Sequence, residues 1–136
     1  MNIAFFLTPK QDVVWVSSAA TLAEALAHME PHRHSAVPML DAEGRYVGTL
    51  AEGDLLWFLR HAERPWAEAA AATLVSAIPL WLKNEPINID AHMETLVARA
   101  SRQSFVPVVD DRQVFVGMVR RKSIIEYCAQ RAGIAG

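Results

Sequence analysis

The feature that most constrains this chain is an internal repeat. Residues 35–41 (SAVPMLD) match residues 104–110 (SFVPVVD) at a shift of 69, with the same Val-Pro pair and closing Asp. A Val-Gly pair follows each copy at that shift, at residues 47–48 and 116–117. Self-similarity at a fixed period indicates a fold built from repeated supersecondary units. We therefore expect two copies of one unit.

The first copy predicts the order strand, helix, strand, strand, helix. Residues 13–16 predict the first strand, and Thr21 with Glu24 predicts a capping box at the start of the first helix. The later elements are expected as a strand at 35–40, a turn at 41–44, a strand at 45–50 and a helix from about residue 53.

The second copy predicts the same order. Ile87 and Ile89 alternate as in a strand, and Asp90 is expected to cap the next helix. The later elements are strands at 104–109 and 114–119 around a turn at 110–113, then a final helix with Ile124, Ile125 and Cys128 on its apolar side. Cys128 is expected to be a core residue rather than a nucleophile.

The repeat also predicts the domain organisation. We expect an α/β (α+β) chain in which residues 1–136 form a single module, with repeat 1 at 7–60, a connecting helix at 61–76 and repeat 2 at 77–130. The connecting helix is expected to start near Pro65. A unit of roughly 60 residues buries little core alone, so the halves are expected to pack sheet to sheet as a pseudo-twofold pair.

Composition excludes several classes of protein. The 136 residues are 52% hydrophobic and 21% charged, which excludes a disordered tail. Apolar stretches are too short to span a bilayer, and the first residues lack the basic start of a signal peptide. A net charge of −2 is poorly suited to a nucleic-acid backbone. We expect a cytoplasmic protein with neither a membrane nor a nucleic acid as partner.

Chemistry-bearing motifs do not predict an enzyme. The chain has no Gly-rich phosphate loop, Gly-x-Ser-x-Gly elbow or His-Glu-x-x-His sequence, so no catalytic residue and no cofactor is expected. His28 and His32 could pair on a helix around a metal, but Pro31 lies between them and no further ligands complete a set. No metal site is therefore expected, and a small enzyme is the least favoured class.

Residues 36–41 with residues 47–56 resemble a CBS motif, whose usual form is Leu-Pro-Val-Val-Asp, then Val-Gly-hydrophobic-hydrophobic-Thr-x-x-Asp-hydrophobic-hydrophobic. Residues 105–125 resemble a second copy. The tandem pair is similar to a Bateman module and, through residues 6–9 and 105–117, to small stand-alone bacterial CBS-pair proteins that sense cyclic di-AMP. The resemblance implies a regulatory module that binds an adenine nucleotide in a cleft between the repeats and signals to an unidentified target protein. Cyclic di-AMP is favoured, with AMP, ADP or ATP next.

The second copy departs from the usual motif by gathering cations. Arg120 and Ser123 stand at its Thr and Asp positions, and Arg120, Arg121 and Lys122 lie where the final helix is expected to begin. A helix N-terminus attracts anions, so a phosphate there would offset the repulsion of three cations. The alternative is a solvated basic turn, or pairing with Asp110 and Asp111.

The resemblance implies the remaining site residues. The nucleotide is expected at Thr8, Val13, Val14, Ser35, Ala36, Arg120, Arg121, Lys122 and Ser123. A second, weaker cleft would use Glu52, Asp54 and Phe105, with the segment near Leu82 and Pro86. Asp54 could instead be a helix cap, Glu52 would repel phosphate, and the valines could be plain core.

The apolar excess predicts a homodimer. Four Trp residues and an Ala-rich connector provide more apolar surface than one small domain needs for its own core. Two-fold pairing is the commonest closed assembly. The helices are expected to form the contact. The alternative function is a structural or dimerisation module with empty clefts and no nucleotide.

Overall fold

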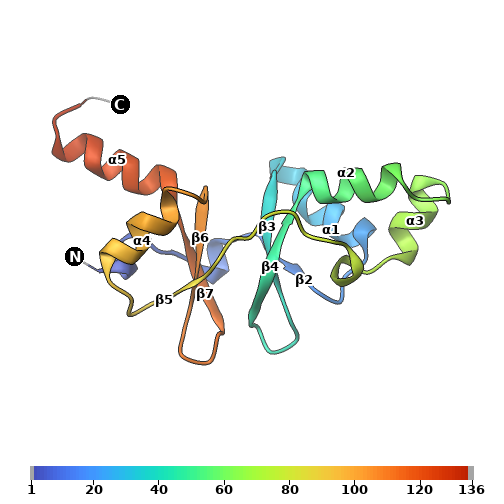
Figure 1. Ribbon diagram of the computed structural model, residues 1–136, viewed down its shortest axis with the longest axis horizontal. Coiled ribbons are helices and arrows are strands. Elements are labelled where there is room, and N and C mark those ends of the chain that lie inside the picture. Colours follow the sequence, from blue (N-terminus) through green and yellow to red (C-terminus); the bar gives the residue numbers. More distant parts are fainter. Residues whose placement is uncertain (1, 135–136) are drawn as a thin grey trace. The chain divides into compact units, whose positions relative to one another are not determined.

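The computed structural model describes residues 2–134 (Figure 1). The chain folds as two compact units. One, the terminal unit, joins Met1–Val13 to Asn84–Gly136, and the other, the central unit, comprises Val14–Lys83. No helix among residues 2–134 is long and apolar enough to cross a membrane.

The central unit is a three-stranded sheet with helices. Its sheet has the order β2-β3-β4, in which β2 is parallel and β4 antiparallel to β3. The elements are β2 (Val16–Ser17), α1 (Leu22–Met29), η3 (Glu30–His32), β3 (Ala36–Leu40), β4 (Tyr46–Ala51), α2 (Glu52–Arg60), α3 (Trp66–Ala72) and η4 (Val75–Ala77). The predicted strand-helix-strand-strand-helix order is confirmed, although the first strand begins only at Val16.

The helices of the central unit pack together beside the sheet (Figure 1). The capping box at the start of α1 is confirmed: Glu24 N donates to Thr21 Oγ1 (3.2 Å), and Thr21 N donates to Glu24 Oε1 (3.0 Å). The bonds that Thr21 N and Thr21 Oγ1 donate to Glu24 Oε1 lower the pKa of Glu24. Buried Ala69 and Ala70 let α3 approach α1 closely. Pro65 stands at the N-cap of α3.

The terminal unit repeats this plan and adds an edge strand. Its sheet has the order β1-β7-β6-β5, in which β5 is parallel and β7 antiparallel to β6. The elements are η1 (Ile3–Phe6), β1 (Thr8–Pro9), η2 (Lys10–Asp12), β5 (Ile87–Asn88), α4 (Met93–Ala100), β6 (Phe105–Val109), β7 (Phe115–Arg120) and α5 (Arg121–Arg131). The order of the second repeat is confirmed as well.

The closing Asp of each repeat shapes the hairpin turn. Asp41 Oδ1 accepts from Glu43 N and Arg45 N, both at 2.9 Å. Asp110 Oδ1 accepts from Arg112 N and Val114 N in the same way, at 2.8 and 3.0 Å. The bond from the Arg45 backbone is the main cause that lowers the pKa of Asp41. This shared turn explains why both copies end in Asp.

Two expectations about the second repeat are wrong. Helix α4 starts at Met93 with His92 at its N-cap, not after Asp90. Asn88 explains why the helix begins later than expected. Its Oδ1 accepts from Asp90 N (2.8 Å) and its carbonyl accepts from Ala91 N (2.9 Å), so residues 88–91 form a turn in place of a helix start. Cys128 is exposed rather than in the core.

The position of Cys128 follows from how α5 packs. Ile124 and Tyr127 of this helix pack against the core of the terminal unit. Residues three apart lie on one side of a helix, so Ile124 and Tyr127 define the buried side of α5. Cys128 lies at the border of that side and stays exposed.

Candidate functional site

The two repeats position their last helices in the same way. Strand β4 runs directly into α2, and β7 runs directly into α5. The first helical N–H donates to the carbonyl of the serine that precedes the first strand of the hairpin: Glu52 N to Ser35 O before β3 (2.8 Å), and Arg121 N to Ser104 O before β6 (2.9 Å). The repeats therefore present equivalent helix N-termini that carry opposite charges.

The helix start of the central unit is acidic. Glu52 is exposed, while Asp54 is only 7% exposed. Asp54 Oδ2 accepts from Ala51 N (2.9 Å), and Oδ1 accepts from Trp81 N (3.0 Å). Asp54 thus caps α2 and anchors the segment around Trp81, which supports the capping role that the sequence left open.

A small hollow lies next to Asp54 in the central unit. It measures about 400 Å³. Aromatic and aliphatic side chains line most of it, including Trp57, Phe58, His61 and Trp81. This hollow is poorly suited to a phosphate, because the acidic Asp54 lines it and no Lys or Arg does.

The helix start of the terminal unit is basic. Arg120 is the N-cap residue of α5, is exposed, and makes no side-chain cap bond. Arg121 is half-buried, and its Nε donates to the carbonyl of Gln103 (3.3 Å). Lys122 is exposed and lies 3.8 Å from Glu126 Oε1. The first turn of α5 contains no acidic residue, so this "basic turn", residues 120–123, is suited to an anion.

Pairing with the nearby acids does not account for the basic turn. Asp110 accepts bonds from the backbone of its own hairpin. Asp111 Oδ1 accepts from Asn88 Nδ2 (2.8 Å). Across residues 2–134, no ion pair joins either acid to the cations of the turn.

The register of the terminal sheet places two further predicted residues beside Arg120. Phe105 lies directly opposite Arg120, and Thr8 lies opposite Met118, two residues earlier on the same strand. Opposite residues share a face, as do alternate residues of a strand. Thr8, Phe105 and Arg120 therefore share one face, on which Phe105 is only 7% exposed, while Val106 and Val119 lie on the opposite face in the hydrophobic core of the terminal unit.

The remaining predicted residues divide between the units. Val13 is buried in the terminal unit and Ser123 is half-buried in the basic turn. Val14, Ser35 and Ala36 belong to the central unit, where Ala36 pairs with Ala51 immediately before α2. Phe105, assigned to the weaker cleft by resemblance, lies in the terminal unit with the basic turn.

Gln103 was not predicted from the sequence. It is 6% exposed and contacts the basic turn through its carbonyl. A lone polar residue before an apolar strand carries no pattern of its own, so its role becomes visible only with its tertiary partners.

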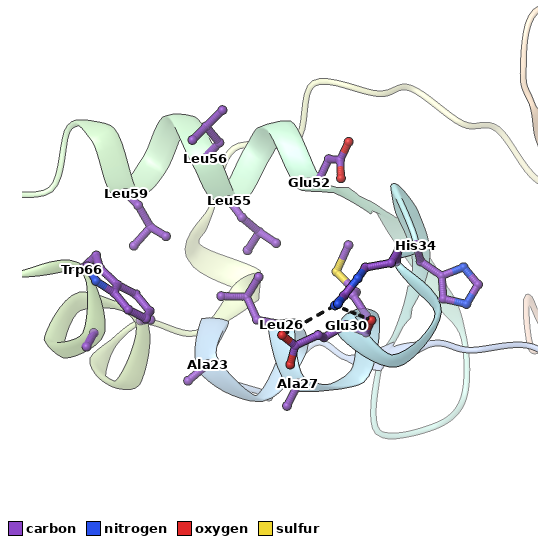
Figure 2. Close-up of a pocket in the computed structure, with 14 residues that line it drawn as sticks. Ala23, Leu26, Ala27, Glu30, His34, Glu52, Leu55, Leu56, Leu59 and Trp66 are labelled. Carbon is purple, nitrogen blue, oxygen red and sulfur yellow. Dashed lines mark hydrogen bonds and ion pairs between the residues drawn. The ribbon is translucent and has the colours of Figure 1, made fainter.

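A larger groove separates the helices of the central unit. It measures about 770 Å³ and is lined mainly by apolar residues of α1, α2 and α3. Figure 2 shows Leu26, Leu55 and Leu59 pointing into it, with Trp66 at one end and Glu30 at the other. Leu56 and Trp66 are 60% and 65% exposed.

The histidines do not form a metal centre in the part of the chain that the structure describes. The rings of His32 and His34 lie 5.6 Å apart. Within residues 2–134, no group of three His, Cys, Asp or Glu side chains could hold a metal ion.

Comparisons with known proteins agree with this architecture. A model of the CBS domain matches residues 6–61 and again residues 75–130. A crystal structure of CbpB in complex with c-di-AMP is similar, with a TM-score of 0.85 at 24% identity over 98% of this chain and 87% of that chain. No curated protein sequence matches this chain.

Two further solved structures are similar over nearly their whole length. CbpB of Listeria monocytogenes in complex with c-di-AMP has a TM-score of 0.82 at 20% identity, over 98% of both chains. A hypothetical conserved protein from Geobacillus kaustophilus has a TM-score of 0.84 at 21% identity, over 96% of this chain and 98% of that chain. At these identities the likeness establishes the fold.

Proposed function

Because this chain belongs to the CBS-domain family and carries two copies of the domain, we propose that it is a regulatory module that binds an adenine nucleotide at the basic turn. Cyclic di-AMP is the favoured ligand, and AMP, ADP and ATP come next. The proposal is carried by one observation: three consecutive cations, unaccompanied by an acid in the first turn, at the start of α5. The module would act in the cytoplasm by signalling to a target protein, not by catalysis.

The chemistry of the basic turn fits a phosphate. Arg side chains bind phosphate oxygens through paired N–H donors, and the helix N-terminus adds backbone N–H groups and partial positive charge. Thr8, on the same face as Arg120, offers a hydroxyl for the nucleoside, and the nearly buried Phe105 offers the small exposed part of its aromatic ring. The c-di-AMP complexes of structurally similar CbpB proteins support the same ligand class.

The acidic start of α2 is proposed to be the weaker location. Glu52 would repel a phosphate, and both carboxylate oxygens of Asp54 already accept backbone N–H groups. A nucleotide that approached this helix would meet one exposed acid in place of three cations.

A thermal-shift panel tests the proposed function. Cyclic di-AMP at about a hundred times its dissociation constant is expected to stabilise the fold by roughly 2.7 kcal/mol. For a chain of this size, that raises Tm by several degrees. AMP, ADP and ATP are expected to give smaller shifts. A stable protein that shows no shift with any of the four would contradict the proposal and favour the structural module without nucleotide.

We also propose that the groove between α1, α2 and α3 is covered by a second copy. Exposed Leu56 and Trp66 beside an apolar groove are the kind of surface that a protein interface buries. Leu56→Glu is expected to convert the dimer to a monomer in sedimentation, because the carboxylate would be buried unpaired. Ala42→Glu, the same change of charge in an exposed turn, should leave the dimer intact. A Leu56→Glu protein that remained dimeric would contradict this interface.

A further inference from the structure

Gln103 holds the segment by which the chain enters the terminal unit. This residue lies between α4 and β6 and is nearly inaccessible. Its Oε1 accepts from Glu85 N (2.9 Å), and its Nε2 donates to the carbonyls of Glu85 and Phe105, both at 3.2 Å. One primary amide therefore satisfies both backbone groups of Glu85, much as a neighbouring strand would.

A second side chain clamps the same segment. Arg99 of α4 lies 3.4 Å from Glu85 Oε2 and donates to the carbonyl of Pro86 (2.6 Å). The chain passes from the central unit to the terminal unit at Lys83 and Asn84, immediately before these contacts. Gln103 and Arg99 therefore hold Glu85 and Pro86 directly after this crossing.

The backbone beside Gln103 contacts the basic turn. Arg121 Nε donates to the Gln103 carbonyl (3.3 Å), and Arg121 N donates to the neighbouring Ser104 carbonyl. Gln103 thus touches Arg121 with its main chain and Glu85 with its side chain. The arrangement is particular to the second repeat, because the residue equivalent to Arg121 in the first repeat is Glu52, whose side chain has no donor for a carbonyl.

We propose that Gln103 couples the basic turn to the chain crossing, so that an anion that fixes Arg121 also tightens the hold on Glu85. This regulatory role rests on the proposed nucleotide function. A ligand shifts a conformational equilibrium only through its different affinities for the two states. Here the favoured state is the one in which Arg121, Gln103 and Glu85 are all engaged.

Amide hydrogen exchange in the ligand-free protein tests the coupling directly. Arg121→Ala is expected to speed exchange at the Glu85 amide about threefold to tenfold relative to the core amide of Val106, as expected for losing one hydrogen bond in the chain of contacts. Arg121→Lys, which keeps the charge but lacks Nε, should behave similarly and serves if the alanine variant does not fold. Unchanged relative exchange at Glu85 would overturn the coupling.

Arg102→Ala is the matched control. It removes the same charge from the position next to Gln103. The Arg102 side chain has no hydrogen bond or ion pair within residues 2–134. Exchange at Glu85 should stay at its wild-type value. Acceleration as large as that in Arg121→Ala would show a general charge effect and overturn the coupling.

Addition of cyclic di-AMP separates the coupling from the proposed function. In the wild-type protein, saturating ligand should slow exchange at Glu85 at least about threefold more than at Val106. Binding without this change would overturn the regulatory role and leave nucleotide binding intact. If cyclic di-AMP does not bind, the proposed function fails for this ligand, and the ligand-free comparison of Arg121 and Arg102 variants still decides the coupling.

Discussion

Replacing Arg121 and Lys122 together by alanine is expected to weaken cyclic di-AMP binding about a hundredfold, because hydrogen bonds to charged groups contribute roughly 1.5–3 kcal/mol each. Arg121 is half-buried and fixed by Gln103, so it can present its terminal nitrogens at little cost in entropy. Lys122 adds charge in the first turn of α5. The dissociation constants of both proteins would be measured by calorimetry at one salt concentration.

The fold should survive this double replacement. Lys122 and Glu126 form an exposed pair at 3.8 Å, and such pairs contribute little to stability. The control is Arg102→Ala combined with Arg112→Ala, which removes the same net charge from exposed positions outside the basic turn. We expect the control to bind cyclic di-AMP with a dissociation constant within about twofold of the wild-type value, since it loses long-range attraction between these cations and the ligand. Wild-type affinity in the Arg121 and Lys122 double variant would show that the site is assigned to the wrong residues.

Gly117→Ala should cause a large loss of stability. At Gly117 the edge strand β1 pairs with β7, and an added Cβ would collide with the carbonyl oxygen of Thr8 and lie 2.9 Å from Leu7 Cδ1. The Thr8 carbonyl is backbone, so relief requires β1 to move away from the sheet. We expect a loss of about 3 kcal/mol in the free energy of unfolding, together with weaker nucleotide binding through displacement of Thr8. Urea denaturation gives the first quantity.

Gly48→Ala is the matched comparison from the first repeat. Its Cβ would lie 2.7 Å from Leu80 Cδ1, the end of a flexible side chain. A rotamer change of Leu80 can relieve that contact, so the expected loss is about 1 kcal/mol. Equal losses in the two variants would show that β1 is not held against Gly117 in solution.

The elements that were predicted correctly depend on local signals. The Thr21 and Glu24 capping box lies within one helical turn, and each hairpin is defined by an apolar strand, a closing Asp and a returning strand. The hairpin signals recur at a fixed shift, so they also predicted the order of elements in both repeats. Asp90 failed as a cap because Asn88, two residues earlier, forms a competing turn.

The pairing of β1 with β7 could not be predicted in the same way. Thr8 and Met118 are more than a hundred positions apart, and a two-residue strand has no periodic pattern. Residues from position 7 onward were assigned to the first repeat, and the CBS match at residues 6–61 has nearly the same bounds, yet the short strand at Thr8–Pro9 pairs with β7 of the second repeat.

The candidate site was predicted only in part, because some of its contacts also join residues that are distant in sequence. Three consecutive cations at the expected start of the final helix are visible in the sequence, and the structure places them in the first turn of α5 or at its cap. The dual role of Asp54 depends on Trp81, and that of Gln103 depends on Glu85. Both partners are distant in sequence, so these roles are not encoded in any local pattern.

Calorimetric titration of the wild-type protein with cyclic di-AMP tests the central claim most directly. We expect saturable binding with one strong site per chain, weakened by added salt because the contacts are between phosphate and cations. AMP, ADP and ATP, titrated in the same way, should bind more weakly. No heat of binding with any of the four nucleotides, or two equal anionic sites per chain, would contradict it.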